Sequence, residues 1–301
     1  MLRPYQAVPR SLRLILRPCA LTSHVAPLSS ALRLNGARPS SSGTQWKQRQ
    51  GRDAYVRHAK VQGLKSRAAF KLLEIDAKYK LFKKGQTVVD LGYAPGSWSQ
   101  VAVDRTRPHG RVIGIDLIPA QPPQGVAAFQ GDFLSPIVQK LVKEFIAQSH
   151  SDRLPKAGRD DVDEDGDNTI IDQPSYIDRE RHSAESSGSP SDSASTESTS
   201  RNLVDVVLSD MLMNTSGIAS RDHAGSMNLC EAALHFASDT LKPGGHLVCK
   251  FYTGAMDKSL EQQLKVLFSE VYREKPESSR AESKEAYFVA LYRKAKATID
   301  H

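Results

Sequence analysis

The sequence predicts an α/β protein built around a mostly parallel β-sheet, and three observations support this prediction. Short runs of β-branched and apolar residues alternate with helical patterns from residue 86 onward, as in strand–helix–strand units. An acidic residue closes several of these runs. A turn of small residues follows the first run, where open α/β sheets bind their ligands. The 301 residues suffice for one such domain with appendages.

The N-terminal residues 1–52 contain no aspartate or glutamate, but many arginines, serines and leucines. Residues 11–17 can form a short basic amphipathic helix. This composition is typical of a mitochondrial transit peptide, so we expect residues 1–45 to be one, cleaved between 25 and 45. A secretory signal is disfavoured because arginines interrupt every apolar run. A disordered basic tail that binds RNA remains the alternative.

Two helices separated at Gly63 are predicted for residues 53–84, with Ser66 capping the second. The apolar stripe of the second helix should consist of Ala69, Phe70, Leu73 and Ala77. Basic residues crowd the same region, namely Arg57, His58, Lys60, Lys65, Arg67 and Lys71. They form either a solvated face or a surface for the RNA backbone.

Alternating elements then fill the rest of the domain. Strands are expected at about 86–91, 111–116, 126–130, 203–210 and 246–251, with helices at 97–106, 135–147, 222–241 and 257–268. The helix at 222–241 should bury Met227, Cys230, Leu234, Ala237 and Leu241 and end at residues 242–245. The last two strands, at about 269–274 and 285–293, should form an antiparallel hairpin.

Residues 149–201 interrupt this alternation. They are rich in Ser, Asp and Glu, and we expect a disordered insertion because such a segment buries too little apolar surface. The segment carries a net charge of −7 within a chain of net +7, so the other residues carry +14. A strongly basic folded part favours a nucleic acid partner.

The remaining composition excludes several classes of protein. No run of about 18 apolar residues occurs, so no membrane span is expected. The three cysteines, Cys19, Cys230 and Cys249, lack metal-binding spacing, and we expect no metal site. Cys230 and Cys249 lie among apolar residues, as buried thiols do in a reducing compartment.

The turn after the first strand spaces its glycines, Gly92 and Gly96, as G-x-x-x-G. Dinucleotide sites use G-x-G-x-x-G instead, so the spacing favours a ligand without a pyrophosphate. S-adenosylmethionine fits better than NAD, and Asp90 at the strand end could take its ammonium group. An ordinary turn of small residues is the alternative.

Acidic residues end four successive strands, at Asp90, Asp116, Asp132 and Asp210. Asp116 lies where an acid can bind both ribose hydroxyls, and Asp132, beside Phe133, can accept from an adenine amine. Each acid alone could simply cap the next helix, but four at one sheet edge favour a ligand site.

Lys250 should meet Asp210 at the same edge. Asp210 and Lys250 end neighbouring parallel strands, and a lysine in an apolar strand is costly unless it is paired or used. Glu285 and Tyr287 share one face of the last strand. Structural salt bridges are the alternative for each charge.

Six motifs in this order resemble the FtsJ/RrmJ ribosomal RNA 2′-O-methyltransferases. They are residues 63–72 (GLKSRAAFKL), 90–100 (DLGYAPGSWSQ), 130–133 (QGDF), 209–211 (SDM), 276–281 (PESSRA) and 283–287 (SKEAY). The resemblance covers residues 53–148 and 202–294. With the presequence, the likeness is nearest to the fungal mitochondrial members, which methylate a uridine of the large-subunit rRNA.

The resemblance implies a Rossmann-like class I S-adenosylmethionine-dependent methyltransferase fold, with seven mostly parallel strands and helices on both faces. It implies a catalytic tetrad of Lys71, Asp210, Lys250 and Glu285. Expected cofactor-binding residues are Gly92, Pro95, Gly96, Ser97, Trp98, Asp116, Asp132, Phe133 and Asp210. The chain departs from the family at Tyr93 and Ser97, which replace smaller residues, and at 211–214, where Met-Leu-Met-Asn replaces Met-Ala-Pro-Asn.

The expected reaction is attack of a ribose 2′-hydroxyl on the sulfonium methyl, with Lys250 either accepting the proton or stabilising the alkoxide. The implied partner is mitochondrial large-subunit rRNA or a pre-ribosomal particle in the matrix, and a monomer is expected. Two alternatives remain. One is a catalytically dispensable ribosome-assembly factor that binds rRNA, and the other is a methyltransferase for tRNA or an mRNA cap.

Overall fold

The computed structural model of the chain describes residues 53–151 and 202–297. The transit peptide predicted at 1–45 lies outside these residues, and so does the predicted insertion from residue 152 onward.

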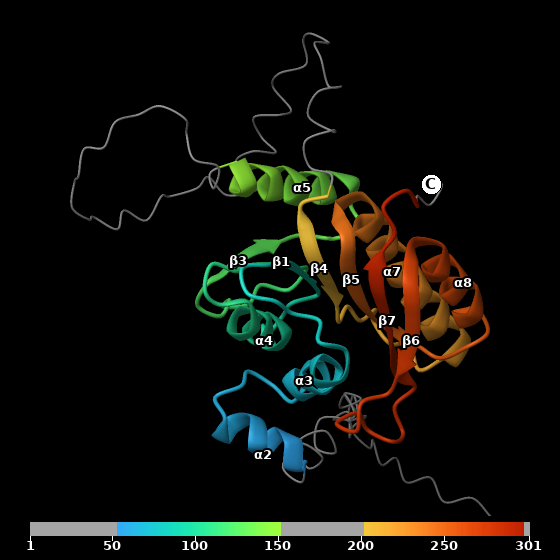
Figure 1. Cartoon of the computed structure of the whole chain (residues 1–301). Helices are drawn as coiled ribbons and strands as arrows, with labels where there is room; N and C mark the ends of the chain where they lie inside the picture. The colour runs from blue at the N-terminus through green and yellow to red at the C-terminus, as the bar shows by residue number, and fades with distance from the viewer. Residues whose placement is uncertain (1–52, 152–201, 298–301) are drawn as a thin grey trace, which may run out of the picture. The chain divides into compact units, whose positions relative to one another are not determined.

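Within the described residues, seven strands form one sheet in the order β3-β2-β1-β4-β5-β7-β6 (Figure 1). The strands are β1 (Thr87–Leu91), β2 (Arg111–Asp116), β3 (Val126–Gln130), β4 (Val204–Ser209), β5 (Leu241–Tyr252), β6 (Phe268–Glu274) and β7 (Glu285–Arg293). The first five are parallel, whereas β7 runs antiparallel to both β5 and β6. The predicted sheet and its C-terminal hairpin are therefore confirmed.

Six helices accompany the described part of the sheet. They are α2 (Ala54–Val61), α3 (Ala68–Tyr79), α4 (Ser97–Thr106), α5 (Pro136–Ser151), α7 (Ala219–Thr240) and α8 (Asp257–Leu267). One hydrophobic core joins the sheet to α3 and α4, and a second joins it to α5, α7 and α8. The helices thus cover both faces (Figure 1), and burial of these apolar side chains is the main force that holds the layers together.

The register of the parallel strands brings their carboxyl ends to one edge. Leu91 of β1 pairs with Ile115 of β2 on one side and with Ser209 of β4 on the other. Asp116 and Asp210 each follow one of these paired residues directly. Both carboxylates therefore leave the sheet beside the turn that follows β1, as the positions of the acids predicted.

The buried face of α3 differs from the predicted stripe. Ala69 is buried as expected, but Ala77 is exposed, and the helix buries Leu72, Ile75 and Asp76 instead. Asp76 accepts a hydrogen bond from the Leu81 amide at 3.0 Å, so a carboxylate lies in the buried row. An apolar pattern does not predict such a position. The expected stripe was wrong at Ala77, whereas Leu73 is partly buried and packs against the core.

Three element boundaries also differ from the sequence prediction. β5 begins at Leu241, because residues 242–245 form an irregularity inside the strand rather than a loop before it. Lys242 holds this irregularity by pairing with Asp205 of β4 at 2.9 Å. Helix α5 continues to Ser151, four residues beyond the predicted end, and α7 begins at Ala219. The five residues predicted for the buried face of the 222–241 helix are all buried.

Candidate active site

The turn after β1 is tied to the neighbouring strand. The amides of Gly92 and Tyr93 both donate to the Ile115 carbonyl, at 2.8 and 3.3 Å. Gly92 has a φ of +78°, and a Cβ added there would lie 2.8 Å from the Cα atom of Met211. Gly96, with a φ of +103°, is the N-cap of α4. Glycine is required at residue 92 both by the backbone conformation and by the close approach of a second chain segment.

Two of the predicted cofactor acids act on the backbone. Asp116 accepts from the amides of Ala94 and Ile118, at 2.9 and 2.8 Å, which holds the turn against the end of β2. Asp132 is exposed and accepts from the Leu134 amide at 2.9 Å. Each carboxylate oxygen has a second lone pair, so these bonds leave acceptor sites for a ligand. Their roles in cofactor binding stay predictions.

Phe133 and Trp98 are both buried, and Trp98 lines the small cavity beside the glycine turn together with Pro95 and Ser97. Phe133 is 5% exposed and packs edge-on against Phe236 in the core. Trp98 is 2% exposed and donates from its indole to the Ala68 carbonyl at 2.9 Å. Ser97, also buried, forms a hydroxyl–hydroxyl hydrogen bond with Ser66 at 2.7 Å. Trp98 and Ser97 therefore fasten α4 to α3 and set the position of the lysine on α3.

Asp90 lies inside the protein near the carboxyl end of β1. It is fully buried, and its Oδ2 atom accepts from the Ser99 hydroxyl at 2.6 Å, while Oδ1 has no partner. That Asp90 takes a ligand ammonium stays a prediction, for which Oδ1 is the available acceptor. Burial raises the pKa of Asp90 to about 7, and the charge of Asp210 adds to this against the opposing Ser99 bond.

This raised pKa predicts a pH-dependent stability. The folded protein binds the Asp90 proton more tightly than the unfolded chain, so stability falls as pH rises from about 4 to 7. Three pKa units correspond to about 4 kcal/mol at most. We expect Asp90→Asn to remove this fall in stability. The measurement is the free energy of unfolding by urea, compared between pH 5 and pH 8. The exposed Asp104 provides the control, since Asp104→Asn should follow the parent at both pH values. Equal slopes in all three proteins would contradict the prediction.

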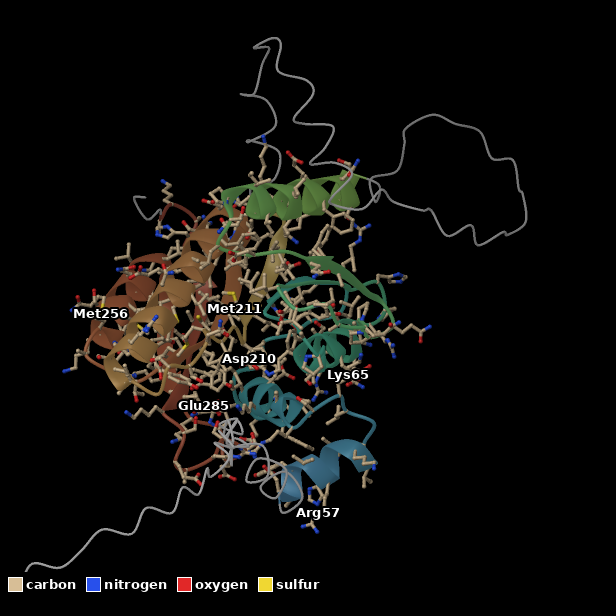
Figure 2. The ribbon with its side chains drawn as sticks, turned by 180° about the vertical axis from the view of Figure 1, so that it is seen from behind. Arg57, Lys65, Asp210, Met211, Met256 and Glu285 are labelled. Carbon is tan, nitrogen blue, oxygen red and sulfur yellow. The ribbon has the colours of Figure 1, made fainter. Side chains whose placement is uncertain are left out.

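The four predicted catalytic residues come together as two ion pairs at the carboxyl edge of the sheet. Lys250 Nζ lies 3.1 Å from Asp210 Oδ1 and donates to the Asp210 carbonyl at 2.6 Å. Lys71 Nζ lies 2.5 Å from Glu285 Oε1. Burial acts to raise the pKa of Glu285, but the charge and hydrogen bond of Lys71 outweigh it and lower that pKa. Figure 2 shows Asp210 between Lys65 and Glu285 in its view.

Tyr287 joins the two pairs, and no catalytic or binding role had been predicted for it. Its hydroxyl donates to Asp210 Oδ1 at 3.2 Å, and the Lys71 ammonium lies 5.8 Å from its ring centroid. Burial and the charges of Asp210 and Glu285 raise the pKa of Tyr287 well above its usual value. The phenol is therefore protonated at neutral pH and remains a donor. The sequence signals for it were the period of two with Glu285 and its place in the motif at 283–287.

A segment after β2 covers the glycine turn. Lys65 Nζ donates to the Gln121 carbonyl at 2.5 Å, and the Tyr93 hydroxyl donates to the Ala120 carbonyl at 2.6 Å. The cavity between this turn, Ala68 and Asp210 measures about 20 Å³. That volume suits one water molecule.

The residues around this turn nevertheless suit S-adenosylmethionine in their chemistry. The Asp210 carboxylate is 20% exposed and can pair with an ammonium group. Gly92 permits close approach to the backbone, and Asp116 retains acceptor sites. Residues 53–151 and 202–297 contain no group of three or more acidic, histidine or cysteine side chains placed to hold a metal ion. None of the helices in these ranges is long and apolar enough to cross a membrane.

Comparison with known proteins places the chain among methyltransferases. The model of the family described as FtsJ-like methyltransferase matches residues 64–293. The mitochondrial rRNA methyltransferase 2 of Saccharomyces cerevisiae is 36% identical, over 89% of this chain and 93% of its own length. The ribosomal RNA large subunit methyltransferase E of Zymomonas mobilis is 36% identical, over 84% of this chain and 90% of its own.

A solved structure shares the fold as well. The crystal structure of a ribosomal RNA methyltransferase from Plasmodium falciparum superimposes with a TM-score of 0.50 at 25% identity. The match covers 77% of this chain and 99% of the other. The predicted fold is confirmed by this likeness together with the strand order.

Proposed function

Because the chain belongs to the FtsJ-like methyltransferase family and uses S-adenosylmethionine as methyl donor, we propose that it methylates the 2′-hydroxyl of a uridine in mitochondrial large-subunit rRNA and so supports ribosome assembly. The family and the names of the relatives support the reaction and the rRNA substrate. The presequence composition and the mitochondrial relative from yeast support the location. Residues 1–45 would direct the chain to the mitochondrial matrix.

The geometry of the ion pairs supports this function most directly. When bound, S-adenosylmethionine supplies an activated methyl group, so the protein has mainly to position the reactants and to handle one proton. Asp210 orients Lys250, and both lie at the sheet edge beside the glycine turn. Lys250 accepts the proton of the 2′-hydroxyl or stabilises the developing alkoxide, while Lys71, Glu285 and Tyr287 complete the charge network.

Ribose-methylation mapping of mitochondrial RNA tests this proposal in cells. In a strain that lacks the chain, one uridine of the large-subunit rRNA should lose its 2′-O-methyl group. The wild-type chain should restore the methyl group, and Lys250→Ala should not. Loss of a methyl group in tRNA alone would refute the rRNA substrate. Rescue of ribosome assembly by Lys250→Ala would mean that the protein acts as a catalytically dispensable assembly factor.

We also propose that the RNA backbone crosses the exposed basic residues of α2 and the connection to α3. Arg57, Lys60 and Lys65 are exposed there, and Figure 2 shows Arg57 pointing away from the body of the domain. Arg67 is excluded from this surface, because it pairs with Asp53 and donates to the Ser278 carbonyl. That pairing fastens α2 and residue 278 to α3, which is a structural role.

The salt dependence of RNA binding tests this surface. Each phosphate contact on single-stranded RNA contributes a slope of about −0.7 in log affinity against log salt. We therefore expect the double variant Arg57→Ala/Lys60→Ala to flatten the slope by about 1.4. Lys83→Ala/Lys84→Ala removes the same charge just before β1, at the opposite edge of the sheet, and should leave the slope unchanged. If both variants flatten it equally, binding depends on net charge rather than on this surface.

A further inference from the structure

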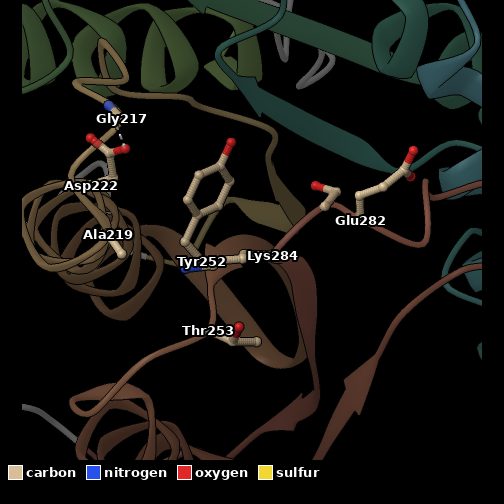
Figure 3. Close-up of a pocket in the computed structure, with 8 residues that line it drawn as sticks. Gly217, Ala219, Asp222, Tyr252, Thr253, Glu282 and Lys284 are labelled. Carbon is tan, nitrogen blue, oxygen red and sulfur yellow. Dashed lines mark hydrogen bonds between the residues drawn. The ribbon is translucent and has the colours of Figure 1, made fainter.

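A second cavity, of about 300 Å³, lies beside the end of β5. Its lining comprises Gly217, Ala219 and Asp222 on one side and residues 282–284 on the other, with Tyr252 and Thr253 between them. Figure 3 shows the ring of Tyr252 standing up from the strand between Asp222 and Glu282, with its hydroxyl directed away from the backbone. No role in the reaction has been assigned to these residues so far.

The strand register places this pocket next to the ion pairs. Tyr252 lies two residues after Lys250 on β5, so both side chains leave the same face of the sheet. On β7, Tyr287 pairs with Lys250 and Glu285 pairs with Tyr252. The two positions on β5 are about 7 Å apart along the strand, which is within the length of one nucleoside. A group that occupies the pocket can therefore present an attached hydroxyl to Lys250.

The walls of the pocket are fixed by hydrogen bonds. The His223 Nε2 atom accepts from the Met256 amide at 2.9 Å, so Nδ1 carries the proton and donates to the Tyr252 carbonyl at 2.8 Å. The Thr253 amide donates to the Lys284 carbonyl at 3.0 Å. Asp222 accepts from the Gly217 amide at 3.1 Å. The pocket is thus built before any ligand arrives.

The lining indicates an uncharged aromatic ligand rather than a phosphate. Asp222 and Glu282 bring two carboxylates to the pocket, whereas Lys284 is the single ammonium residue of its lining. The excess of negative over positive charge in this lining would repel a phosphate. Tyr252 is half-buried and presents a ring face on which a nucleobase can stack, as bases do in single-stranded RNA sites. The volume lies at the lower end of the range for small-molecule sites.

We propose that this pocket holds the base of the nucleotide whose ribose is methylated, stacked on Tyr252. The inference rests on the proposed function and adds the binding site of the target base. Burial raises the pKa of Tyr252 against the opposing charge of Lys250, and nearby carboxylates, including Glu285, raise it further. The phenol is therefore neutral, and its ring can stack without carrying a negative charge toward the RNA.

A cycle of enzyme and substrate changes tests the stacking. The probe is a short fragment of the large-subunit rRNA around the methylated uridine, made intact and with an abasic ribose at that position. Loss of the base should weaken binding to the wild-type enzyme by about five- to 150-fold, the range for stacking of one base on an aromatic ring. With Tyr252→Ala, the intact and abasic fragments should bind nearly equally. Tyr252→Phe retains the ring and should restore the difference.

A control variant and the contrary outcomes distinguish a failure of the base pocket from a failure of the proposed function. Tyr292→Ala removes an exposed tyrosine at the far end of β7 and should keep the full difference between the two fragments. Equilibrium binding is measured alongside kcat and KM, so an inactive variant still yields a result. An unchanged difference in Tyr252→Ala would overturn the pocket while leaving methylation by the wild-type enzyme intact. If the wild-type enzyme methylates no RNA, the proposed function itself fails.

Discussion

Replacing Lys250 with alanine should abolish methyl transfer and leave the affinity for S-adenosylmethionine largely unchanged. The Lys250 side chain is 8% exposed, and its ammonium group makes two interactions with Asp210, one with the carboxylate and one with the carbonyl oxygen. It is the buried cation nearest to that acid, at the sheet edge where the 2′-hydroxyl must arrive. Groups that handle a proton in this way contribute about 10²- to 10⁴-fold to the rate. Single-turnover transfer to an rRNA fragment measures the effect, and calorimetry measures cofactor binding.

Lys242 provides a matched control for this variant. It lies on the same strand and pairs with Asp205 of the same neighbouring strand, at the opposite edge of the sheet. Lys242→Ala should therefore disturb the β4–β5 ladder in a similar way but retain turnover. If both variants lose activity equally, the loss reflects damage to the strand pair and not the chemistry of Lys250.

The variant Lys250→Arg separates the two proposed roles. An arginine keeps the positive charge but is not deprotonated in proteins. Partial activity in Lys250→Arg would indicate electrostatic stabilisation of the alkoxide. Activity as low as that of Lys250→Ala, in a protein of parental thermal stability, would indicate proton acceptance.

The second large effect is expected at Gly92, where alanine should abolish cofactor binding and destabilise the fold. A side chain at a φ of +78° is strained, which costs about 1–2 kcal/mol. The added Cβ would also lie 2.8 Å from the Met211 Cα atom, so the backbone that follows Asp210 must shift. Forcing an added group into a packed site costs about a further 1–3 kcal/mol of folding free energy. The shift would move the Asp210 carboxylate away from both Lys250 and the glycine turn.

Gly85 separates backbone strain from the steric clash. It has the same φ of +78°, but no atom lies within 4 Å of an added Cβ. Gly85→Ala should therefore lower the free energy of unfolding only by the backbone strain, about 1–2 kcal/mol, and should bind cofactor normally. Urea unfolding and calorimetry with S-adenosylhomocysteine measure both properties. Normal cofactor affinity in Gly92→Ala would show that the turn adapts and that the close approach to Met211 is unimportant.

Much of the fold could be predicted from the sequence because its signals are local. The alternation of strand and helix, the predicted bounds of α4, β2 and β3, and the turn at Gly92 all follow from short-range patterns of size, polarity and backbone freedom. The acids at the strand ends share one edge because parallel strands direct their carboxyl ends the same way. The prediction of these features does not require knowledge of contacts between residues that are distant in the chain.

The meeting of Asp210 and Lys250 was expected from the neighbouring strand ends, but only the tertiary structure decided that Lys71 pairs with Glu285. The resemblance named four catalytic positions, but Lys71 and Glu285 are separated by 214 residues in the chain. Their contact depends on how α3 packs against the sheet and on the register between β5 and β7. The same packing seals Asp90 inside and places Tyr287 between the ion pairs.

The pocket at Tyr252 could also not be predicted from the sequence alone. Its two walls come from the start of α7 and from the residues before β7, which lie about sixty positions apart in the chain. Local patterns determine which segments become strands and helices, because those depend on neighbouring residues. The faces that meet, and the sites formed between them, depend on burial and register across the whole domain, and these were visible only once the chain was folded.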